Sequence, residues 1–500
     1  ADRGLIFTYL KQSTAHVHSW PQIRKQTPSI MQQSFHGRET NCACFIGTLE
    51  RKNEKNQFHM LATGSEDTTV NVIIYNPAKI DEQRFHKAFS CEGHISSVRC
   101  LAYINAHPDA VPATHHYRHL LFSGGSRASL KCWSLDVESI FSNGVNGKLS
   151  ELNPSLNSSC MLLAELRSLS RRSRKKKQLD SRKGNEFTCD VRFMSLSAFS
   201  VSELLRLAWA DVDVQPPAAV GVIAACSDGY LRFYVFNYQL KSFTLIGQGS
   251  GNERCVLCVG HFFHVTSTQT RLIVYASDTA GYISFWDVTH LYIEHFARQK
   301  SKDIHDTEIV EEDDLDDKRS EVESNSSLSY DLRSENRVLE GPDKIKSTEV
   351  ALRPFCFFKL HQSGVNSISL MRKENDQYLL CSGGDDGAVA FASFKIRAVN
   401  EKVDTCLWSM LSVPDAHTSA ATGVKLLNEN TGVSASVDQR LKLWKICWND
   451  EMPAASLIDT FWLDVVDVHD IDVQPDRNGL YYVTAAGVGL QMFTLKNAKS

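Results

Sequence analysis

Hydrophobic and polar positions alternate in short runs along this chain, and the run at Ser436–Trp444 shows the pattern most clearly. Leu441 and Leu443 would lie on one face of a strand and Lys442 on the other, a period of two that is typical of a half-buried strand. Asp438 precedes the run in a predicted tight turn, six positions before the tryptophan that ends the strand. We therefore predict a strand, a turn and a second strand here.

The same turn and strand recur along the chain. Counting back six positions from each strand-closing residue gives turn positions that are about 50 residues apart, or about twice that where an insertion interrupts the chain. This spacing is close to the repeat of four-stranded propeller blades, which is about 40–45 residues. The turn positions are Asp67, Arg127, Asp228, Ala280, Asp386, Asp438 and Gly487. The repeat therefore predicts an all-β fold, a seven-bladed WD40 β-propeller with two long loop insertions.

Each repeat contains strand-like runs in the same order. The first repeat has four, at Thr40–Thr48, Phe58–Thr63, Thr68–Tyr75 and Arg84–Ser90. The last repeat has three before the chain ends, at Asp467–Val473, Leu480–Ala485 and Leu490–Leu495. A blade that lacks one strand would leave an open sheet edge, which propellers avoid by closing the ring.

The N-terminal region offers the missing strand. We predict that Ser29–Phe35 completes the last blade, so that residues 29–500 form the propeller. Gly4–Leu10 is also strand-like but is left over, and residues 1–28 are interpreted as a remnant of, or linker from, an upstream propeller. The first residue is Ala1 rather than Met, which favours a chain that lacks its N-terminal part.

Two insertions interrupt the repeat, at residues 136–186 and 289–350. The first is basic, and its clustered cations are Arg171, Arg172, Arg174, Lys175, Lys176, Lys177, Arg182 and Lys183. The second is acidic and then rich in serine, with Glu308, Glu311, Glu312, Asp313, Asp314, Asp316 and Asp317 close together. This composition predicts disorder in the acidic insertion.

A histidine often precedes the first strand of a repeat. We interpret these histidines, the turn aspartates and the closing tryptophan as a structural network, because buried polar groups must be paired and a repeated network would pair them. Its predicted members are His36, Asp67, His94, Asp228, His361, Asp386, His417, Asp438 and Trp444. A catalytic or metal-binding role for these histidines is the weaker alternative. Arg127, Ala280 and Gly487 replace the turn aspartate, so their repeats should lack the full network.

Composition limits the possible partners. A net charge of −4 gives no overall basic field for nucleic acid, so any such surface must be local. No apolar run is long enough to cross a bilayer and no signal peptide opens the chain, so we expect a cytoplasmic protein without a membrane partner. The 14 cysteines show no framework and are predicted to be free core thiols. Cys255 and Cys258 form a lone CxxC for which core packing is favoured over zinc or redox chemistry.

No reaction centre is evident in the sequence. There is no phosphate-binding glycine loop before a helix, no HExxH and no serine nucleophile elbow, so a binding platform is favoured over an enzyme. The basic run Arg171–Lys177 has two interpretations that the residues leave open. It is either a solvated or nuclear-localisation-like loop, or a set of phosphate contacts. It contains no aromatic residue that could stack on a base, so phosphate contacts would position rather than read a nucleic acid.

Several phrases in order resemble the family of WD repeat-containing protein 6. They are Gly64–Val70, His94–Arg99, Val191–Leu196 after the basic insertion, Ala225–Gly229, Arg254–Leu257 and Ser436–Trp444. The resemblance covers nearly the whole chain and corresponds to the C-terminal half of the family. The sequence departs from the family pattern in its acidic insertion. It also has Ile73 and Ala392 at positions where other repeats have an aromatic residue.

The resemblance implies a non-catalytic partner of an FtsJ-like methyltransferase that adds a 2′-O-methyl group to the wobble nucleotide (position 34) of the tRNA anticodon loop. The partner enzyme would bind S-adenosylmethionine, so no cofactor, metal or small-molecule substrate is expected on this chain. The clustered cations from Arg171 to Lys183 become candidate tRNA contacts.

Two other classes remain open. A ubiquitin-ligase substrate receptor of the WD40 type would show Trp-Asp-x-Arg at the end of a third strand, and the nearest match, Trp286–Thr289, has threonine in the last place. An enzyme built around the central channel would need carboxylates or metals there, but most acidic residues outside the insertions fall at predicted turns.

Overall fold

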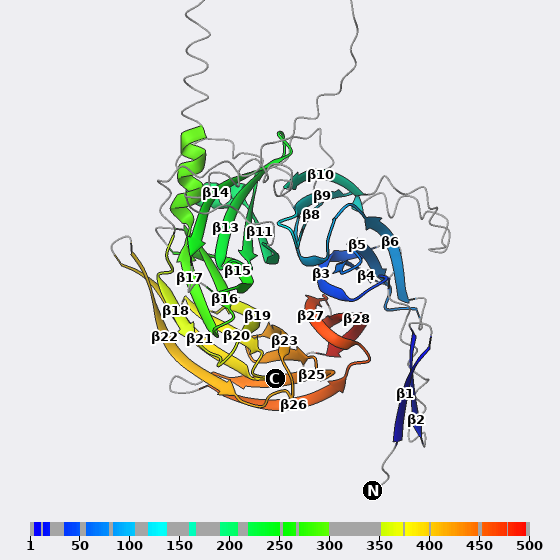
Figure 1. Cartoon of the computed structure of the whole chain (residues 1–500). Helices are drawn as coiled ribbons and strands as arrows, with labels where there is room; N and C mark the ends of the chain where they lie inside the picture. The colour runs from blue at the N-terminus through cyan, green and yellow to red at the C-terminus, as the bar shows by residue number, and fades with distance from the viewer. Residues whose placement is uncertain are drawn as a thin grey trace, which may run out of the picture.

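The structure is a computed structural model of the 500-residue chain (Figure 1). It describes residues 5–11, 14–20, 35–50, 57–79, 84–105, 119–137, 160–166, 191–208, 219–250, 254–266, 270–299, 352–373, 376–399, 402–448, 453–477 and 479–496. Within these residues, seven sheets are arranged around a central channel and an eighth, two-stranded sheet lies outside the ring.

Six of the seven sheets have four strands joined in sequence order, each antiparallel to the next. Blade 1 is β3 (Thr40–Glu50), β4 (Gln57–Ser65), β5 (Val70–Tyr75) and β6 (Phe85–Cys91), and blade 2 is β7 (Val98–Asn105), β8 (His119–Gly125), β9 (Leu130–Leu135) and β10 (Cys160–Leu166). Blade 3 is β11 (Phe193–Ser200), β12 (Ala219–Cys226), β13 (Tyr230–Asn237) and β14 (Ser242–Ser250), and blade 4 is β15 (Val256–Val265), β16 (Thr270–Asp278), β17 (Tyr282–Asp287) and β18 (Cys356–Lys359).

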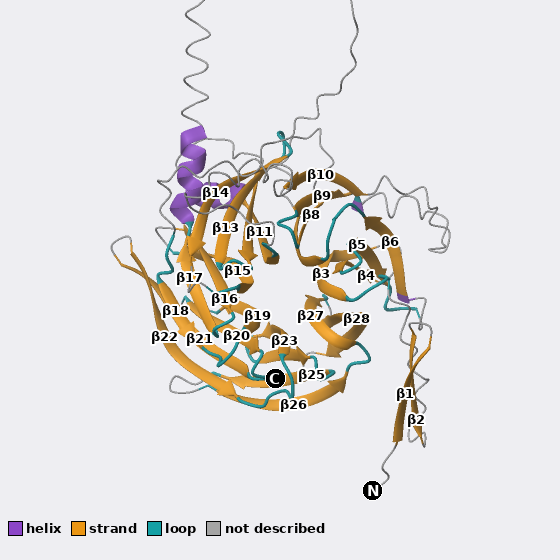
Figure 2. Cartoon of the chain, viewed as in Figure 1, coloured by secondary structure: helices purple, strands orange, loops and turns teal. Residues whose placement is uncertain are grey.

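Blades 5 and 6 follow the same plan. Blade 5 is β19 (Val365–Arg372), β20 (Gln377–Gly384), β21 (Val389–Val399) and β22 (Lys402–Val413), and blade 6 is β23 (Ala421–Asn428), β24 (Thr431–Ser436), β25 (Arg440–Cys447) and β26 (Ala454–Trp462). Blade 7 contains β27 (Val466–Pro475) and β28 (Leu480–Lys496), and β1 (Leu5–Lys11) pairs with β2 (Thr14–Trp20) in the separate hairpin. Figure 2 shows how completely strands dominate the ring.

The predicted seven-bladed all-β propeller is confirmed, and the four strands predicted for the first repeat correspond to β3–β6. Two details differ. The predicted strands Leu480–Ala485 and Leu490–Leu495 belong to the single element β28, within which Gly489 has φ of 118°. The predicted closing strand Ser29–Phe35 lies, except for its last residue, outside the described residues.

The strands differ in burial according to their place in a blade. Second and third strands such as β5 and β12 are buried along their whole length, because both of their faces pack against neighbouring blades. The innermost strand β7 alternates between buried and half-buried positions, since one face lines the channel. Buried and more exposed side chains therefore alternate along a strand where one of its faces meets water.

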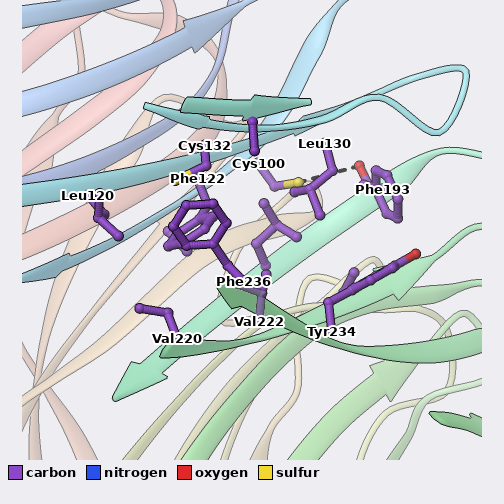
Figure 3. Packing of buried hydrophobic residues seen from close by; sticks show 14 of the residues in the cluster. Cys100, Leu120, Phe122, Leu130, Cys132, Phe193, Val220, Val222, Tyr234 and Phe236 are labelled. Carbon is purple, nitrogen blue, oxygen red and sulfur yellow. Dashed lines mark hydrogen bonds between the residues drawn. The ribbon is translucent and has the colours of Figure 1, made fainter. Parts of the chain in front are cut away.

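Neighbouring blades are joined by apolar side chains. Between blades 2 and 3, Phe122 of β8 and Phe236 of β13 lie with ring centroids 5.9 Å apart at 75°, and Figure 3 shows them among the aliphatic residues of the same cluster. Both rings are fully buried. Stacking face against face in this way gives each blade a core that it could not bury alone.

The ring closes between blades 7 and 1. Asp470 and Asp472 of β27 accept hydrogen bonds from the backbone amides of Ala43 (3.0 Å) and Phe45 (2.8 Å) in β3. Innermost strands leave one edge unpaired, so these carboxylates satisfy amides that would otherwise lack a partner. Ser367 uses its hydroxyl in the same way, accepting from the amide of Val424 in the next blade.

The segment with the basic run and the second insertion leave the ring on opposite faces. In a blade of four antiparallel strands, the turn between strands two and three and the loop into the next blade lie at one end, which we call the turn face. Residues 167–190 connect β10 to β11, and therefore leave from the turn face, whereas residues 300–351 lie in the connection from β17 to β18 at the opposite face.

The predicted first insertion is also divided. Its range, 136–186, contains β10, which is the outer strand of blade 2, so it is two connections rather than one excursion. The structure contains the helix α3 (Val201–Ala208) and a helix over residues 289–299 that begins the second insertion. Both contribute side chains to one apolar cluster at the opposite face.

Cys91 and Cys160 form a disulfide between β6 and β10. The prediction that all thiols are free is wrong at these two positions, because the outer strands of blades 1 and 2 lie side by side and bring together cysteines 69 residues apart. In the part of the chain that the structure describes, no helix has the length and apolar character needed to cross a membrane.

Candidate nucleic-acid interface

Three blades contain the predicted histidine–aspartate pair on the turn face. The Nδ1 atoms of His36, His361 and His417 lie 3.0–3.2 Å from a carboxylate oxygen of Asp67, Asp386 and Asp438, respectively. In each pair the histidine lies in the loop just before the first strand of the blade, and the aspartate lies in the turn just before the third strand. The pairs therefore tie the two kinds of loop together.

Blade 6 has the most complete form of this network. Trp444 donates its Nε1–H to Oγ of Ser434 (2.8 Å), and Nε2 of His417 lies 2.7 Å from the same oxygen. With the serine hydroxyl donating to Nε2, Nδ1–H is free to donate to Asp438, so every buried polar atom of the chain Trp–Ser–His–Asp has a partner.

Burial sets the charge state of this network. It lowers the pKa of His417 to about 4 despite the nearby Asp438 carboxylate, so the imidazole is neutral at pH 7. Burial alone would raise the pKa of Asp438, but hydrogen bonds from the Thr418 amide and from His417 outweigh it and leave the pKa below its usual value. With the imidazole neutral and the carboxyl ionised, His417 and Asp438 form a fixed hydrogen bond, and the proton stays on the imidazole.

Blade 2 has its histidine but no turn aspartate. His94 contacts the hydroxyls of Ser123 (2.7 Å) and Ser129 (3.2 Å), and burial together with the field of Lys131 lowers its pKa to about 4. Arg127 occupies the turn position and is exposed. Lys131, which is fully buried, pairs with Glu165 of the outer strand at 2.6 Å.

Blade 3 corrects one prediction. Asp228 pairs with no histidine among the described residues and accepts two hydrogen bonds from the guanidinium of Arg232, at 2.9 and 2.6 Å. The histidine position before β11 is taken in the sequence by Cys189, which lies outside the described residues. A buried arginine thus supplies the donors that the missing imidazole would have provided.

Blade 4 departs furthest from the pattern. Ala280 stands at the turn position, and Asp278, two residues earlier, accepts from the amides of Ala280 and Tyr282. The Nε1 of Trp286 is buried without a hydrogen-bond partner in the described part of the chain. Its partner should be the residue ten positions earlier, as for Trp444 and Ser434, but here that residue is Ala276.

The clustered cations from Arg171 to Lys183 lie outside the described residues, but the places where their segment joins the ring are described. The segment leaves at Leu166, the end of β10, and returns at Val191 on the turn face. The carbonyl of Val191 accepts from the amide of Ala128, in the turn of blade 2, at 2.8 Å. The amide of Arg192 donates to Oγ of Ser227, in the turn of blade 3, at 3.0 Å.

Further arginines surround this point. Arg127 precedes Ala128 in the turn, Arg192 follows Val191, and Arg254 precedes β15, and all three are exposed. Arg99 is half-buried in β7, and its Nε is buried without a hydrogen-bond partner among the described residues. Sequence reasoning missed these side chains because they are far apart along the chain, although each stands directly beside a predicted turn or first strand.

The pKa of the Cys255 thiol is influenced by two of these arginines. Burial raises the pKa of its thiol and Asp228 adds to the effect, while Arg192 and Arg99 oppose it. Within the described ranges no three histidine, cysteine or carboxylate side chains are placed to hold a metal ion, and the pKa of Cys258 is also raised by burial, as expected for packing rather than redox chemistry.

No family model matches the chain, but curated relatives do. It is 25% identical over 528 residues to the tRNA (34-2'-O)-methyltransferase regulator WDR6 of Mus musculus, 26% over 530 residues to that of Rattus norvegicus, and 24% over 505 residues to that of Homo sapiens. The alignments cover 95–98% of this chain but only 39–40% of the relatives, in their C-terminal portion. The resemblance predicted from the motifs is confirmed.

Solved structures with related folds were also found. They are "Structure of U3-55K", with a TM-score of 0.44 and 12% identity, and "Crystal structure of RRP9 WD40 repeats", with a TM-score of 0.43 and 13% identity. Each covers 90% of this chain, which spans 89% and 88% of those chains, respectively.

Proposed function

We propose that this chain is a non-catalytic WD40 adaptor that works with an FtsJ-like methyltransferase in 2′-O-methylation of the wobble nucleotide of tRNA. It binds the tRNA and positions the anticodon loop, while the partner enzyme holds S-adenosylmethionine and performs the chemistry in the cytoplasm. The observation that carries the proposal is similarity over 98% of the chain to proteins named as regulators of a tRNA 34-2′-O-methyltransferase.

The turn face supports a role in positioning. The segment that contains Arg171–Lys177 starts and ends on this face, and its return point is hydrogen-bonded between two turns. A rigid ring with a cationic segment can hold a phosphate backbone in one place without any catalytic group. Each lysine or arginine that neutralises a phosphate releases counterions, so binding should weaken steeply with salt.

The ubiquitin-ligase alternative has no support from the described residues. The Trp-Asp-x-Arg arginine is replaced by Thr289, whose side chain is buried and donates to Asp287 at 2.6 Å. A buried hydroxyl that caps its own loop cannot present the cation that such a receptor would need.

The test combines partner capture with methylation mapping. The full-length protein should co-purify with an FtsJ-like enzyme, and depletion should remove wobble 2′-O-methylation from the affected tRNAs. The wild-type protein should restore it, whereas a variant with Arg171, Arg172, Arg174, Lys175, Lys176 and Lys177 changed to Ala should restore it poorly. Unchanged methylation after depletion would contradict the proposed function.

A further inference from the structure

The turn face of blades 2–4 carries both exposed arginines and aromatic side chains. We use the name blade 2–4 sector for Arg127, Arg192, Tyr230, Arg254 and Tyr282, which follow one another around the ring in the part of Figure 1 that holds β9, β11, β13, β15 and β17. The basic run itself contains no aromatic residue. The folded blades therefore supply, on the face where the segment with the basic run joins the ring, the kind of group that the run lacks for binding bases.

The sector is continuous through its backbone contacts. The carbonyl of Val191 binds the turn that carries Arg127, and the amide of Arg192 binds the turn that precedes Tyr230. The carbonyl of Cys255, next to Arg254, accepts from the amide of Thr279 at 3.1 Å, in the turn that precedes Tyr282. Each cation is thus held next to the following turn rather than on an independent loop.

The aromatic residues are partly open to solvent. Tyr230 and Tyr282 are half-buried, and Phe357 of β18 is 58% exposed, with its ring centroid 5.8 Å from that of Tyr282 in a T-shaped arrangement. The Lys359 ammonium lies 5.4 Å from the centroid of the Tyr282 ring. A base could stack on the open face of Phe357 while a phosphate meets Lys359 or Arg254, which is the arrangement that single-stranded RNA sites use.

The charge of the sector differs from that of the neighbouring blades. Its turn carboxylate Asp228 is neutralised by Arg232, and Asp278 is buried and accepts backbone amides. On the turn face of blades 5 and 6, by contrast, Asp385 and Asp415 are exposed. The turn face of blades 2–4 therefore offers a polyanion exposed arginines beside turn carboxylates that are already paired or buried.

We propose that the blade 2–4 sector binds unpaired RNA nucleotides, with Arg127, Arg192 and Arg254 on the phosphates and Phe357 beside Tyr282 stacking on a base. This inference rests on the proposed function, which supplies tRNA as the ligand, and it adds that the ring contacts the RNA directly and prefers a single-stranded loop to a duplex.

The phosphate contacts are tested by salt dependence. In the 500-residue chain, changing Arg127, Arg192 and Arg254 together to Gln should lower the magnitude of the slope of log affinity against log salt by about 2 for an unmodified tRNA transcript, since each contact to a single strand contributes about 0.7. The matched control changes three cations of the opposite face to Gln. They are Arg298, Arg372 and Lys373. The control should leave the slope unchanged.

The stacking contact is tested by affinity at constant salt. Phe357→Ala should weaken binding of an anticodon stem-loop by about tenfold without changing the salt slope, because stacking releases no counterions. Binding of a blunt RNA duplex should not change. Trp462→Ala is the control, because Trp462 is similarly exposed, at 64%, and lies 5.0 Å from the Arg440 guanidinium but belongs to blade 6.

The outcomes separate this inference from the proposed function. If changing Arg171–Lys177 removes tRNA binding while both sector variants bind like wild type, the sector proposal is overturned and the adaptor function stands. Equal losses from Trp462→Ala and Phe357→Ala would also overturn the sector. If the unaltered chain and its methyltransferase complex bind no tRNA, both fail. Thermal unfolding of each variant shows that the fold is retained.

Discussion

Blades 6 and 4 share one architecture but satisfy their polar groups differently. In blade 6, Trp444, Ser434, His417 and Asp438 form an unbroken chain of hydrogen bonds. In blade 4, Trp286 has the same buried position but no partner for its Nε1 among the described residues. The apolar packing of a blade therefore suffices to build it, and the network adds stability and fixes the loops.

The histidine–aspartate pair is present in some blades of the ring and absent from others. Blades 1, 5 and 6 keep the histidine–aspartate pair. Blade 7, with Gly487 at its turn position, lacks the pair, and each of the three consecutive blades 2, 3 and 4 lacks at least one member of it. These are the blades that present Arg127, Arg192 and Arg254. Arg127 stands at the turn position itself, so a structural carboxylate has been exchanged for an exposed cation. Departures from a repeat are expected where a surface has acquired a function.

The largest expected effect is the loss at acid pH of the stability that the hydrogen-bond network contributes to blade 6. The pKa of His417 is about 4 in the folded protein and near 6.5 when unfolded, so the unfolded chain binds more protons between these values and stability falls as pH drops from 6.5 to 4. The full contribution is about 3 kcal/mol. Urea unfolding at pH 7 and pH 4.5 should show a smaller acid loss for His417→Gln than for the wild-type protein. An equal loss would mean that the imidazole is charged in the fold.

Removing the turn carboxylate of blade 6 should have the next largest effect. Asp438→Ala leaves Nδ1 of His417 and the Thr418 amide without their acceptor, and we expect a loss of about 1–3 kcal/mol in the free energy of unfolding. Asp459→Ala, at an exposed position of the same blade, is the control and should change stability by less than about 0.5 kcal/mol. If the two variants are equally stable, the network does not stabilise the blade.

The smallest effect should come from restoring the missing partner in blade 4. Ala276→Ser places a hydroxyl ten positions before Trp286, as in blade 6, and should stabilise the protein by about 0.5–1.5 kcal/mol. Ala224→Ser, at the equivalent position of blade 3, offers no indole N–H and should destabilise it, because the new hydroxyl is buried without that partner. Chemical denaturation measures both. Equal destabilisation by the two serines would show that crowding, rather than pairing, decides the outcome at Ala276.

Much of the fold could be read from the local pattern. The alternation of side chains and the repeated turn positions correctly predicted seven blades and the four strands of blade 1. The repeat also indicated the positions at which three histidine–aspartate pairs are found. These features depend on residues near one another in sequence or on a repeat that multiplies a weak signal. Asp228 was misread for the same reason, because the repeat suggested a histidine partner where a nearby arginine serves.

Long-range features were not readable in this way. The pattern at Ser436–Trp444 determines a strand, a turn and a network, because each step follows from the spacing of neighbouring side chains. Which face each insertion leaves, the Cys91–Cys160 disulfide, and the grouping of Arg127, Arg192 and Arg254 were decided only by the tertiary structure. Closing the ring fixes which strand ends meet, and that geometry brings together residues that no local spacing connects.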